Sequence, residues 1–486
     1  MRLFRRITFT LFCLAYLIIC PLTILHAFGY SFGPNVQQPL VKTGLIYLST
    51  TPSGASVYLG KRRFTQRTPA TLSGLLPGEY NVRVVMKDFR PWERVLPVAA
   101  EKATALENIL LLPARLLPQQ KYREAISSLV EIPGTHYLLL MTGPLLRDIS
   151  IYDWKEDKAW PLLEEQSSWR PAEVIEVNVV PDSQQVLFHV EQAGQSYWLS
   201  AFVRRGEMAV EDLTKMLVDA PELFFWNTPL HRYLFAFQKT WINRVDFAGH
   251  AVSPKWADGV KGFGLSGRSF YALHSDGQLV RLDRDGKEEE QIARLELPKP
   301  PALGRPSWFR IHMAGPNSFF LTGSRGELLS TRAPYQLVES GVLGCDWVLH
   351  RQKALFWTKQ QIGLLKVSDE MFEFEKNEEP VKLHWIDYAG EAIQQVQWVD
   401  EGAHLLIRDN SQLFLADLQS YGPPQIELLA QSASPFVYVE ELGRIYYLEP
   451  ETRHLVSLQL LSKKEILPLP ALEYRSLHEP EADKQR

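Results

Sequence analysis

The sequence predicts a mainly β protein with an N-terminal transmembrane helix, a small β-sandwich and a seven- or eight-bladed β-propeller. Three observations lead to this fold class. Residues 7–28 form one apolar run, residues 44–112 alternate polar and apolar positions between closely spaced Gly and Pro residues, and residues 121–470 repeat a three-strand pattern. Alternation with period two is typical of β-strands, and a repeat of about 44 residues is typical of propeller blades.

The N-terminal run is long enough to cross a membrane. Residues 7–28 contain no Asp, Glu, Lys or Arg, and as a helix they would extend over about 33 Å, compared with a hydrocarbon core of about 30 Å. A cleavable signal peptide has a shorter apolar core and a small-x-small cleavage site. The best candidate for such a site, residues 25–27, lacks the first small residue. We therefore expect an uncleaved signal anchor, and cleavage is the alternative.

The residues around this run set its expected orientation. Arg2, Arg5 and Arg6 precede the run, and positively charged residues favour the cytoplasmic side of a membrane helix. Residues 1–6 are therefore expected to form a cytoplasmic tip of a single-pass protein of the cell membrane, with the bulk of the chain extracytoplasmic. Residues 29–43 lack hydrophobic periodicity, so we expect a spacer there.

The overall composition limits the classes of partner. The chain has 45% hydrophobic and 22% charged residues and a formal net charge of −4, which provides no basic face for nucleic acid. Two of its three cysteines, Cys13 and Cys20, lie in the apolar run, so Cys345 alone remains in the exported part. An intramolecular disulfide or a cysteine-based zinc site is therefore excluded there.

Residues 44–112 are expected to form a small antiparallel sandwich. Short alternating stretches are separated by Gly54, Gly60 and Gly78, where tight turns need a positive φ. In chain order the segment contains Pro52-Ser53-Gly54-Ala55, Val57-Tyr58-Leu59-Gly60-Lys61, Thr68-Pro69, Pro77-Gly78-Glu79-Tyr80 and Asp88-Phe89-Arg90-Pro91-Trp92. These motifs resemble those of the PEGA domain. The resemblance implies a transthyretin-like or Ig-like β-sandwich common in prokaryotic envelope and surface proteins, and it implies no catalytic residue.

One basic cluster in this segment is a candidate contact site. Lys61, Arg62, Arg63 and Arg67 follow Gly60 at an expected hairpin tip. Each cation could gain about 1 kcal/mol beside an anionic surface, so lipid phosphates and anionic envelope polymers are candidate partners. A solvated hairpin tip without a ligand is the simpler interpretation.

Beyond a linker expected at residues 113–120, an apolar stretch recurs eight times as the second strand of a unit. It is found at residues 137–140, 186–188, 233–237, 270–273, 319–321, 354–357, 404–407 and 445–448. In several units the next strand ends near an Asp, as at Asp153, Asp246, Asp283 and Asp417. A ring of such sheets buries apolar faces that a single sheet exposes. We therefore expect a propeller over residues 121–470, resembling WD40-like or TolB-like propellers in general, with eight blades favoured over seven.

Two segments of the C-terminal part depart from this strand pattern. Residues 209–216 form a short stretch with helical amphipathic character, so a helix is expected there. Residues 471–486 are rich in charged residues and have almost nothing apolar after Leu477, so we expect a disordered tail.

A search for catalytic and metal-binding motifs finds none that is complete. The chain has no Gly-x-Ser-x-Gly elbow, no His-Glu-x-x-His and no phosphate-binding loop. Asp276-Gly277 is explained more simply as a hairpin turn than as part of a calcium loop. Histidines such as His312 and His404 fall on expected strands of different units, and Cys345 is interpreted as a small buried residue. We therefore expect no catalytic residue, metal site, cofactor or enzyme activity.

The sequence favours a non-enzymatic, membrane-anchored binding or scaffold protein of the cell envelope. In this interpretation the sandwich and the propeller contact an envelope protein or polysaccharide. The alternative is an extracytoplasmic hydrolase or lyase whose residues converge from several blades on the propeller channel. A sensor or assembly factor is a third candidate, although residues 1–6 are too few for a signalling domain.

Overall fold

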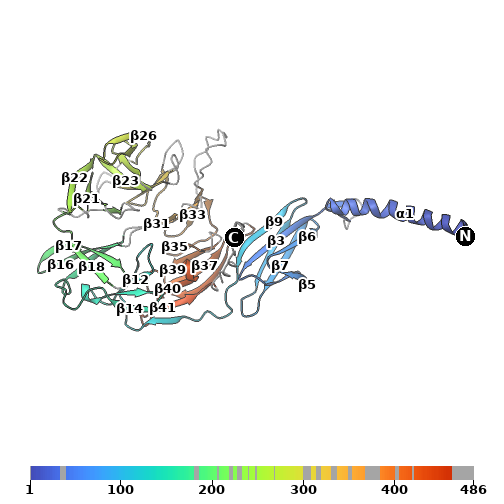
Figure 1. The fold of residues 1–486 in the computed structure, drawn as a ribbon, viewed down its shortest axis with the longest axis horizontal. Helices are drawn as coiled ribbons and strands as arrows, with labels where there is room; N and C mark the ends of the chain where they lie inside the picture. The colour runs from blue at the N-terminus through green and yellow to red at the C-terminus, as the bar shows by residue number, and fades with distance from the viewer. Residues whose placement is uncertain are drawn as a thin grey trace, which may run out of the picture.

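The computed structural model describes residues 2–32, 40–179, 185–204, 207–217, 223–226, 233–238, 240–246, 249–266, 269–298, 308–313, 319–329, 337–347, 353–366, 384–399, 404–418 and 421–461. Helix α1 (Arg2–Ala27), a small sandwich and a larger array of sheets follow one another along the longest axis of the molecule (Figure 1). The chain is mainly β with one N-terminal apolar helix, which confirms the predicted fold class. The expected tail at residues 471–486 lies outside the described residues.

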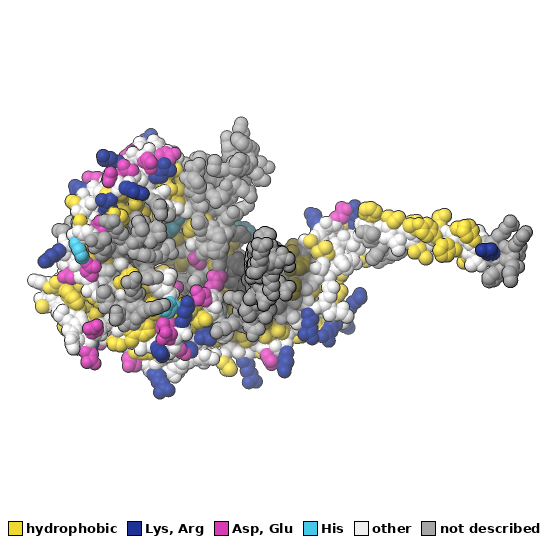
Figure 2. Space-filling view, viewed as in Figure 1, with side chains coloured by type: hydrophobic (Ala, Val, Ile, Leu, Met, Phe, Trp, Pro, Cys, Tyr) yellow, Lys and Arg dark blue, Asp and Glu magenta, His cyan; other side chains and the backbone are white. Residues whose placement is uncertain are grey.

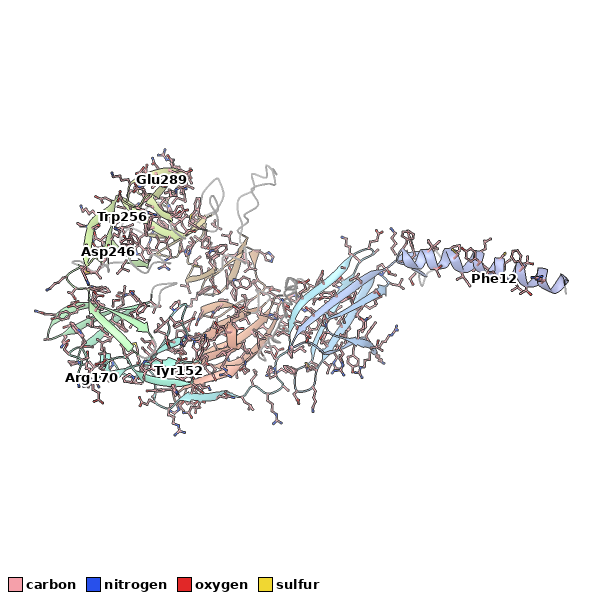
Figure 3. All side chains as sticks on the ribbon, viewed as in Figure 1. Phe12, Tyr152, Arg170, Asp246, Trp256 and Glu289 are labelled. Atoms are coloured by element: carbon pink, nitrogen blue, oxygen red, sulfur yellow. The ribbon has the colours of Figure 1, made fainter. Side chains whose placement is uncertain are left out.

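Helix α1 presents its apolar side chains to the surroundings. The stretch Thr8–Leu25 has a mean hydropathy of 2.2, and 0% of it is buried inside the protein. Phe9, Phe12 and Leu17 are 70%, 71% and 75% exposed, and Figure 3 shows Phe12 on the part of the helix that stands clear of the rest of the protein. Such an apolar surface is unfavourable in water. The length and composition of α1 fit a membrane anchor or a signal sequence.

The expected spacer after α1 contains a short antiparallel pair of strands, β1 (Tyr30–Phe32) and β2 (Leu40–Lys42). Directly after β2, the backbone N–H and the hydroxyl of Thr43 both donate to the carbonyl of Gly29, at 2.8 and 2.9 Å. The chain two residues after the end of α1 is therefore hydrogen-bonded to the residue that directly precedes β3.

The sandwich consists of two sheets with the strand orders β6-β3-β9 and β5-β4-β7-β8. Its strands are β3 (Gly44–Thr51), β4 (Ser56–Leu59), β5 (Arg62–Arg67), β6 (Ala70–Leu75), β7 (Gly78–Val85), β8 (Trp92–Val98) and β9 (Ala103–Leu110). β9 runs parallel to β3, whereas β3 and β6 are antiparallel. The other sheet is antiparallel throughout.

The alternation seen in the sequence builds the core of the sandwich. Every second residue of β3 and of β8 is buried. Ile46, Leu48, Val57, Val82 and Leu96 lie between the sheets with 0% exposure. Burial of each such side chain contributes about 1.5–3 kcal/mol, so apolar packing rather than a disulfide stabilises this domain.

Within the described residues, the rest of the chain forms eight four-stranded units. Units one to three comprise β11 (Ser128–Glu131), β12 (Tyr137–Met141), β13 (Ile149–Asp153) and β14 (Lys158–Pro161); β15 (Glu173–Val179), β16 (Gln185–Gln192), β17 (Gln195–Arg204) and β18 (Glu207–Asp212); and β19 (Leu223–Trp226), β20 (Tyr233–Gln238), β21 (Trp241–Asp246) and β22 (Ala251–Asp258). Units four and five comprise β23 (Val260–Ser266), β24 (Ser269–His274), β25 (Gln278–Leu282) and β26 (Glu288–Arg294); and β27 (Phe309–Met313), β28 (Phe319–Gly323), β29 (Leu328–Leu329) and β30 (Leu337–Glu339).

Units six and seven comprise β31 (Gly344–Trp347), β32 (Lys353–Trp357), β33 (Ile362–Lys366) and β34 (His384–Trp385); and β35 (Ile393–Val399), β36 (His404–Asp409), β37 (Gln412–Asp417) and β38 (Gln425–Gln431). Unit eight combines β39 (Val437–Val439), β40 (Arg444–Leu448) and β41 (Leu455–Gln459) with β10 (Gln119–Tyr122), which pairs with β41 from the other end of the array. In the part of the chain that the structure describes, two 3-10 helices, η1 (Leu146–Asp148) and η4 (Glu440–Leu442), lie between strands. The first and last parts of the array therefore share one sheet.

The strand pattern of the array agrees with the sequence except at one place. All eight apolar stretches predicted as second strands lie in β12, β16, β20, β24, β28, β32, β36 and β40. The helix predicted at residues 209–216 is wrong, because Ala209 and Val210 belong to β18 and pair with the long strand β17. Pairing with a neighbouring strand here outweighs the local helical pattern.

Successive units pack through shared apolar clusters. Trp256 of unit three has its ring centroid 5.0 Å from that of Phe235 in the same unit and 5.3 Å from that of Phe270 in unit four; Figure 3 labels Trp256. The same kind of contact joins units one and eight, where the rings of Tyr152 and Tyr446 lie 6.0 Å apart within one buried cluster. Packing as well as strand pairing thus connects the two ends of the array.

The sandwich is fixed to unit seven by buried polar contacts. Trp92 Nε1 donates to Asp417 Oδ2 at 3.1 Å, and both residues are buried. The guanidinium of Arg94, also buried, donates to the carbonyls of Tyr421 and Pro423 at 3.0 and 3.1 Å. We call these contacts, together with the ion pair of Arg90 and Glu427 at 2.7 Å, the clasp.

Candidate functional site

The four basic residues singled out in the sequence lie together on one edge of the sandwich. Arg62, Arg63 and Arg67 belong to β5, and Lys61 lies in the turn before it. All four are exposed, and β5 is the outermost strand of its sheet because it pairs only with β4. Among the described residues, none of the four forms an ion pair. We call these four residues the basic edge.

Strand pairing extends the positive charge across the outer face of the sheet. Arg63 lies opposite Tyr58 on β4, and Tyr58 lies opposite Arg83 on β7. Two strand spacings separate Arg63 from Arg83, which is about 10 Å. Figure 2 shows Lys and Arg side chains gathered along the side of the sandwich on which Figure 1 labels β5. The basic edge is therefore part of a wider surface that could contact several phosphates or carboxylates.

A cavity of about 650 Å³ lies where the helix joins the sandwich. Its lining includes Ser31, Thr43, Ser73, Glu101 and Lys102. At its border Glu101 forms an ion pair with Lys42, which raises the Lys42 pKa, and the ammonium of Lys42 lies 5.4 Å from the centre of the Tyr30 ring. The cavity is a recess of mixed polar and apolar lining that holds one cation and one anion, Lys102 and Glu101, directly after the apolar helix.

A second group of charged residues lies on the first strands of the units. The first strands of units four and five, β23 and β27, pair in parallel. Burial raises the pKa of Glu131 at the end of β11, and the nearby carboxylate of Asp346 on β31 raises it further. The Glu131 side chain is nevertheless exposed, so solvent screens both effects and the rise in its pKa is smaller than for a buried carboxyl. Units one and six thus bring two carboxyl groups within electrostatic range.

Two other residues near this pair have properties of packed rather than reactive groups. Burial lowers the pKa of His312 to about 3, with a smaller contribution from Arg310. The His312 ring stacks on Phe320 with centroids 4.6 Å apart, and its Nε2 lies 3.0 Å from the hydroxyl of Thr322. Burial raises the pKa of Cys345 to about 11, so its sulfur is a thiol at neutral pH. A thiol is a poor nucleophile, in line with the sequence-based interpretation of Cys345.

The carboxyl pair has one feature that general acid–base chemistry requires. A carboxyl with a raised pKa beside an ionised carboxylate is a common arrangement of an acid and its partner. The backbone N–H of Trp398 donates to Asp346 Oδ2 at 2.9 Å, which orients this carboxyl group. In the part of the chain that the structure describes, no group of three or more His, Cys, Asp or Glu residues could hold a metal ion.

The sequence located the basic edge but missed the clasp and the carboxyl pair. Trp92 and Asp417 are 325 residues apart in the chain, and no local pattern connects them. The one available signal is the alternation of β8, which places Trp92 and Arg94 on the buried face. Glu131 and Asp346 gave no signal, because their proximity depends on how units one and six are arranged in space.

Comparison with solved structures finds similar folds at low identity. A computationally designed protein, Ika8, aligns with 70% of this chain and 97% of its own length at 10% identity and a TM-score of 0.41. BamB from Moraxella catarrhalis aligns with 70% of this chain and 99% of its own at 10% identity and a TM-score of 0.43. PorZ, a surface component of the type-IX secretion system of Porphyromonas gingivalis, aligns with 68% of this chain and 42% of its own at 12% identity and a TM-score of 0.36. At these TM-scores the similarities support no argument about function.

Comparison of sequences identifies one domain. No curated protein matches the chain. Residues 43–110 match the family model of the PEGA domain, and these residues span β3 to β9. The match confirms the resemblance seen in the motifs. The sandwich is thus the part of this chain that is similar to the PEGA family.

Proposed function

We propose that this chain is a non-enzymatic binding or scaffold protein of the cell envelope, anchored in the membrane by α1 with the sandwich and the array outside. Its partners are an envelope protein or a polysaccharide. The two β domains act as one contact body, and α1 holds this body at the membrane surface.

The clasp is the observation that carries this proposal. Asp417 and Arg94 are each 7% exposed and make their hydrogen bonds across the boundary between the domains. Separating the domains would leave these groups without those partners, and removing one partner of a buried charged group costs several kcal/mol. A flexible linker would serve a protein whose domains work independently. Because the clasp instead holds the sandwich and the array in a fixed orientation, the two domains can form one binding surface together.

The anchor supports the location. α1 has the length of a membrane span, and its apolar side chains are exposed along the helix. The N–H and hydroxyl bonds from Thr43 to Gly29 tie the residues that follow α1 to the start of the sandwich. The contact body is therefore held near the surface in a preferred orientation.

Affinity purification tests the binding function. The full-length chain, solubilised in mild detergent from native membranes, is expected to retain a discrete envelope protein or polysaccharide. A variant with Trp92→Ala and Arg94→Ala, which opens the clasp, is expected to lose that species while remaining in the membrane. The proposal fails if the wild-type chain retains no envelope component and turns over an envelope substrate instead.

A second candidate function rests on the carboxyl pair. Glu131 and Asp346 would act as acid and base in an extracytoplasmic hydrolase or lyase. If purified protein degrades an envelope polymer, Glu131→Gln is expected to reduce the rate by at least about 100-fold, the contribution usual for a general acid. A rate unchanged by Glu131→Gln would exclude this role.

A further inference from the structure

We infer that the basic edge docks on anionic lipid headgroups, so that the sandwich lies against the membrane beside its own anchor. This inference rests on the proposed function, because it requires α1 to span the membrane. It adds a second, electrostatic membrane contact that the helix alone does not provide.

The position of β5 relative to α1 is the first argument. In Figure 1, β5 lies on the side of the sandwich from which α1 leaves. The bonds between Thr43 and Gly29 and the ion pair between Lys42 and Glu101 restrict how the sandwich can tilt about the end of the helix. A membrane crossed by α1 would therefore have its surface near the level of the basic edge.

The chemistry of the edge is the second argument. Lys61, Arg62, Arg63 and Arg67 are exposed, and in the described part of the chain no carboxylate forms an ion pair with them. Arg62 lies with its guanidinium carbon 5.3 Å from the centre of the half-buried Phe64 ring. Guanidinium groups in a row can each form two hydrogen bonds with a phosphate. The free edge of β5 leaves room for such contacts.

The tether makes a weak attraction sufficient. Near an anionic surface each Lys or Arg favours binding about fivefold. For a soluble domain this attraction would give only modest affinity. A domain that a helix already holds at the surface has lost the entropy of association through that helix, so its docking does not have to offset it again. Four cations at the surface therefore predict a largely docked sandwich on anionic membranes and an undocked one on neutral membranes.

Energy transfer to the lipid surface measures docking directly. The full-length chain, with Cys13, Cys20 and Cys345 replaced by Ala, carries a donor dye at Thr65→Cys, an exposed position within β5. It is reconstituted into vesicles that contain acceptor-labelled lipid, with or without phosphatidylglycerol in phosphatidylcholine. A donor at Glu156→Cys in unit one serves as a reference position distant from the edge.

The expected result is strong transfer from position 65 in anionic vesicles, weaker transfer in neutral ones, and a loss of the difference at about 1 M salt, where the screening length is about 3 Å. Reversal of the edge by Lys61→Glu, Arg62→Glu, Arg63→Glu and Arg67→Glu should lower the ratio of docked to undocked protein at least tenfold. The matched control reverses four exposed cations of the array, Lys158, Lys215, Arg284 and Lys287. This control has the same net charge as the edge variant and should dock like the wild type.

Co-flotation of the same samples distinguishes a failure of the inferred docking from a failure of the proposed membrane anchor. Flotation with neutral vesicles but equal transfer in both lipids overturns the docking of the edge and leaves the anchor intact. Flotation with anionic vesicles only, lost in the edge variant, supports the edge and contradicts the anchor. Absence of flotation with either lipid overturns both. Equal loss of transfer in the edge variant and in the control also contradicts the inference, because net charge alone would then explain it.

Discussion

Asp417 ends the third strand of its unit, as Asp153 does in unit one, but its carboxylate has a different role. Asp153 Oδ1 accepts the backbone N–H groups of Lys155 and Glu156 at 2.7 and 3.1 Å and so stabilises a hairpin turn. Asp417 instead accepts the indole N–H of Trp92 from the sandwich. The same residue at the same place in the repeat thus serves the turn in one unit and the domain interface in another.

Replacing Trp92 by Phe tests the strength of this interface. The change keeps most of the buried aromatic surface but removes the N–H donor from the buried Asp417 carboxylate, which is expected to lower the free energy of unfolding by about 1–3 kcal/mol. Denaturant unfolding measures it. Trp160→Phe is the matched control, because the buried Nε1 of Trp160 has no hydrogen-bond partner among the described residues. A similar loss in both variants would show that the hydrogen bond contributes nothing.

His312 makes stability depend on acid pH. Its pKa is about 3 in the folded protein, compared with about 6.5 in the unfolded chain. Above pH 6.5 both states carry neutral His312 and the residue has no effect. As the pH falls from 6.5 towards 3, only the unfolded chain binds the proton, so stability decreases by up to about 1.4 kcal/mol per pH unit.

His312→Gln should therefore flatten the decrease in stability between pH 6.5 and pH 3, measured as urea midpoints across that range. Gln can still bond to the hydroxyl of Thr322. The exposed His384 supplies the control, and His384→Gln should leave the slope of the wild type unchanged. Equal slopes for wild type and His312→Gln would contradict the buried, neutral histidine.

At the level of elements, the contact between the first strands of units four and five depends on a residue without a side chain. A Cβ on Gly264 would lie 2.3 Å from the carbonyl oxygen of Ile311 and 2.7 Å from its Cβ. β23 and β27 pair in parallel two residues before this point. Only glycine allows the two strands to approach so closely.

Gly264→Ala is accordingly expected to destabilise the protein by about 1–3 kcal/mol, the cost usual for overpacking. Thermal unfolding followed by circular dichroism measures the change. Ser266→Ala, at the end of the same strand, should stay within about 0.5 kcal/mol of the wild type. A neutral Gly264→Ala would mean that the strands are further apart than the structure has them.

The sequence predicted the individual strands better than the contacts between segments that are distant in the chain. Every second strand of the eight units was found, because residues such as Leu139 and Tyr446 form short apolar runs between turn residues. The helix expected at residues 209–216 failed because pairing with β17 decided the conformation there. The basic edge was found because Gly60 marks a turn and the charges are adjacent in sequence. The clasp and the carboxyl pair depend on contacts between distant segments, which no local period encodes.

On the scale of the whole molecule, the two ends of the array depend on each other. β10 contributes the outer strand of unit eight by pairing with β41, and the side chain of Gln120 bonds to His454 at 2.8 Å. A chain that ends at residue 448 lacks β41 and leaves β10 without its partner. It is expected to unfold at lower temperature and less cooperatively than the full chain. A chain that ends at residue 461 keeps every described strand and should retain the midpoint, so equal losses in both truncations would contradict the shared sheet.

The proposed function requires that α1 anchor the two β domains outside the cell membrane, and labelling of intact cells tests this most directly. A chain carrying Glu156→Cys, an exposed position of unit one, with Cys13, Cys20 and Cys345 replaced by Ala, is treated with a membrane-impermeant maleimide, and the membranes are then washed with alkaline carbonate. We expect the chain to be labelled without lysis, to remain in the washed membranes and to keep its N-terminal residues 1–28. Labelling only after lysis, or a soluble chain that begins near Phe28, would contradict the account.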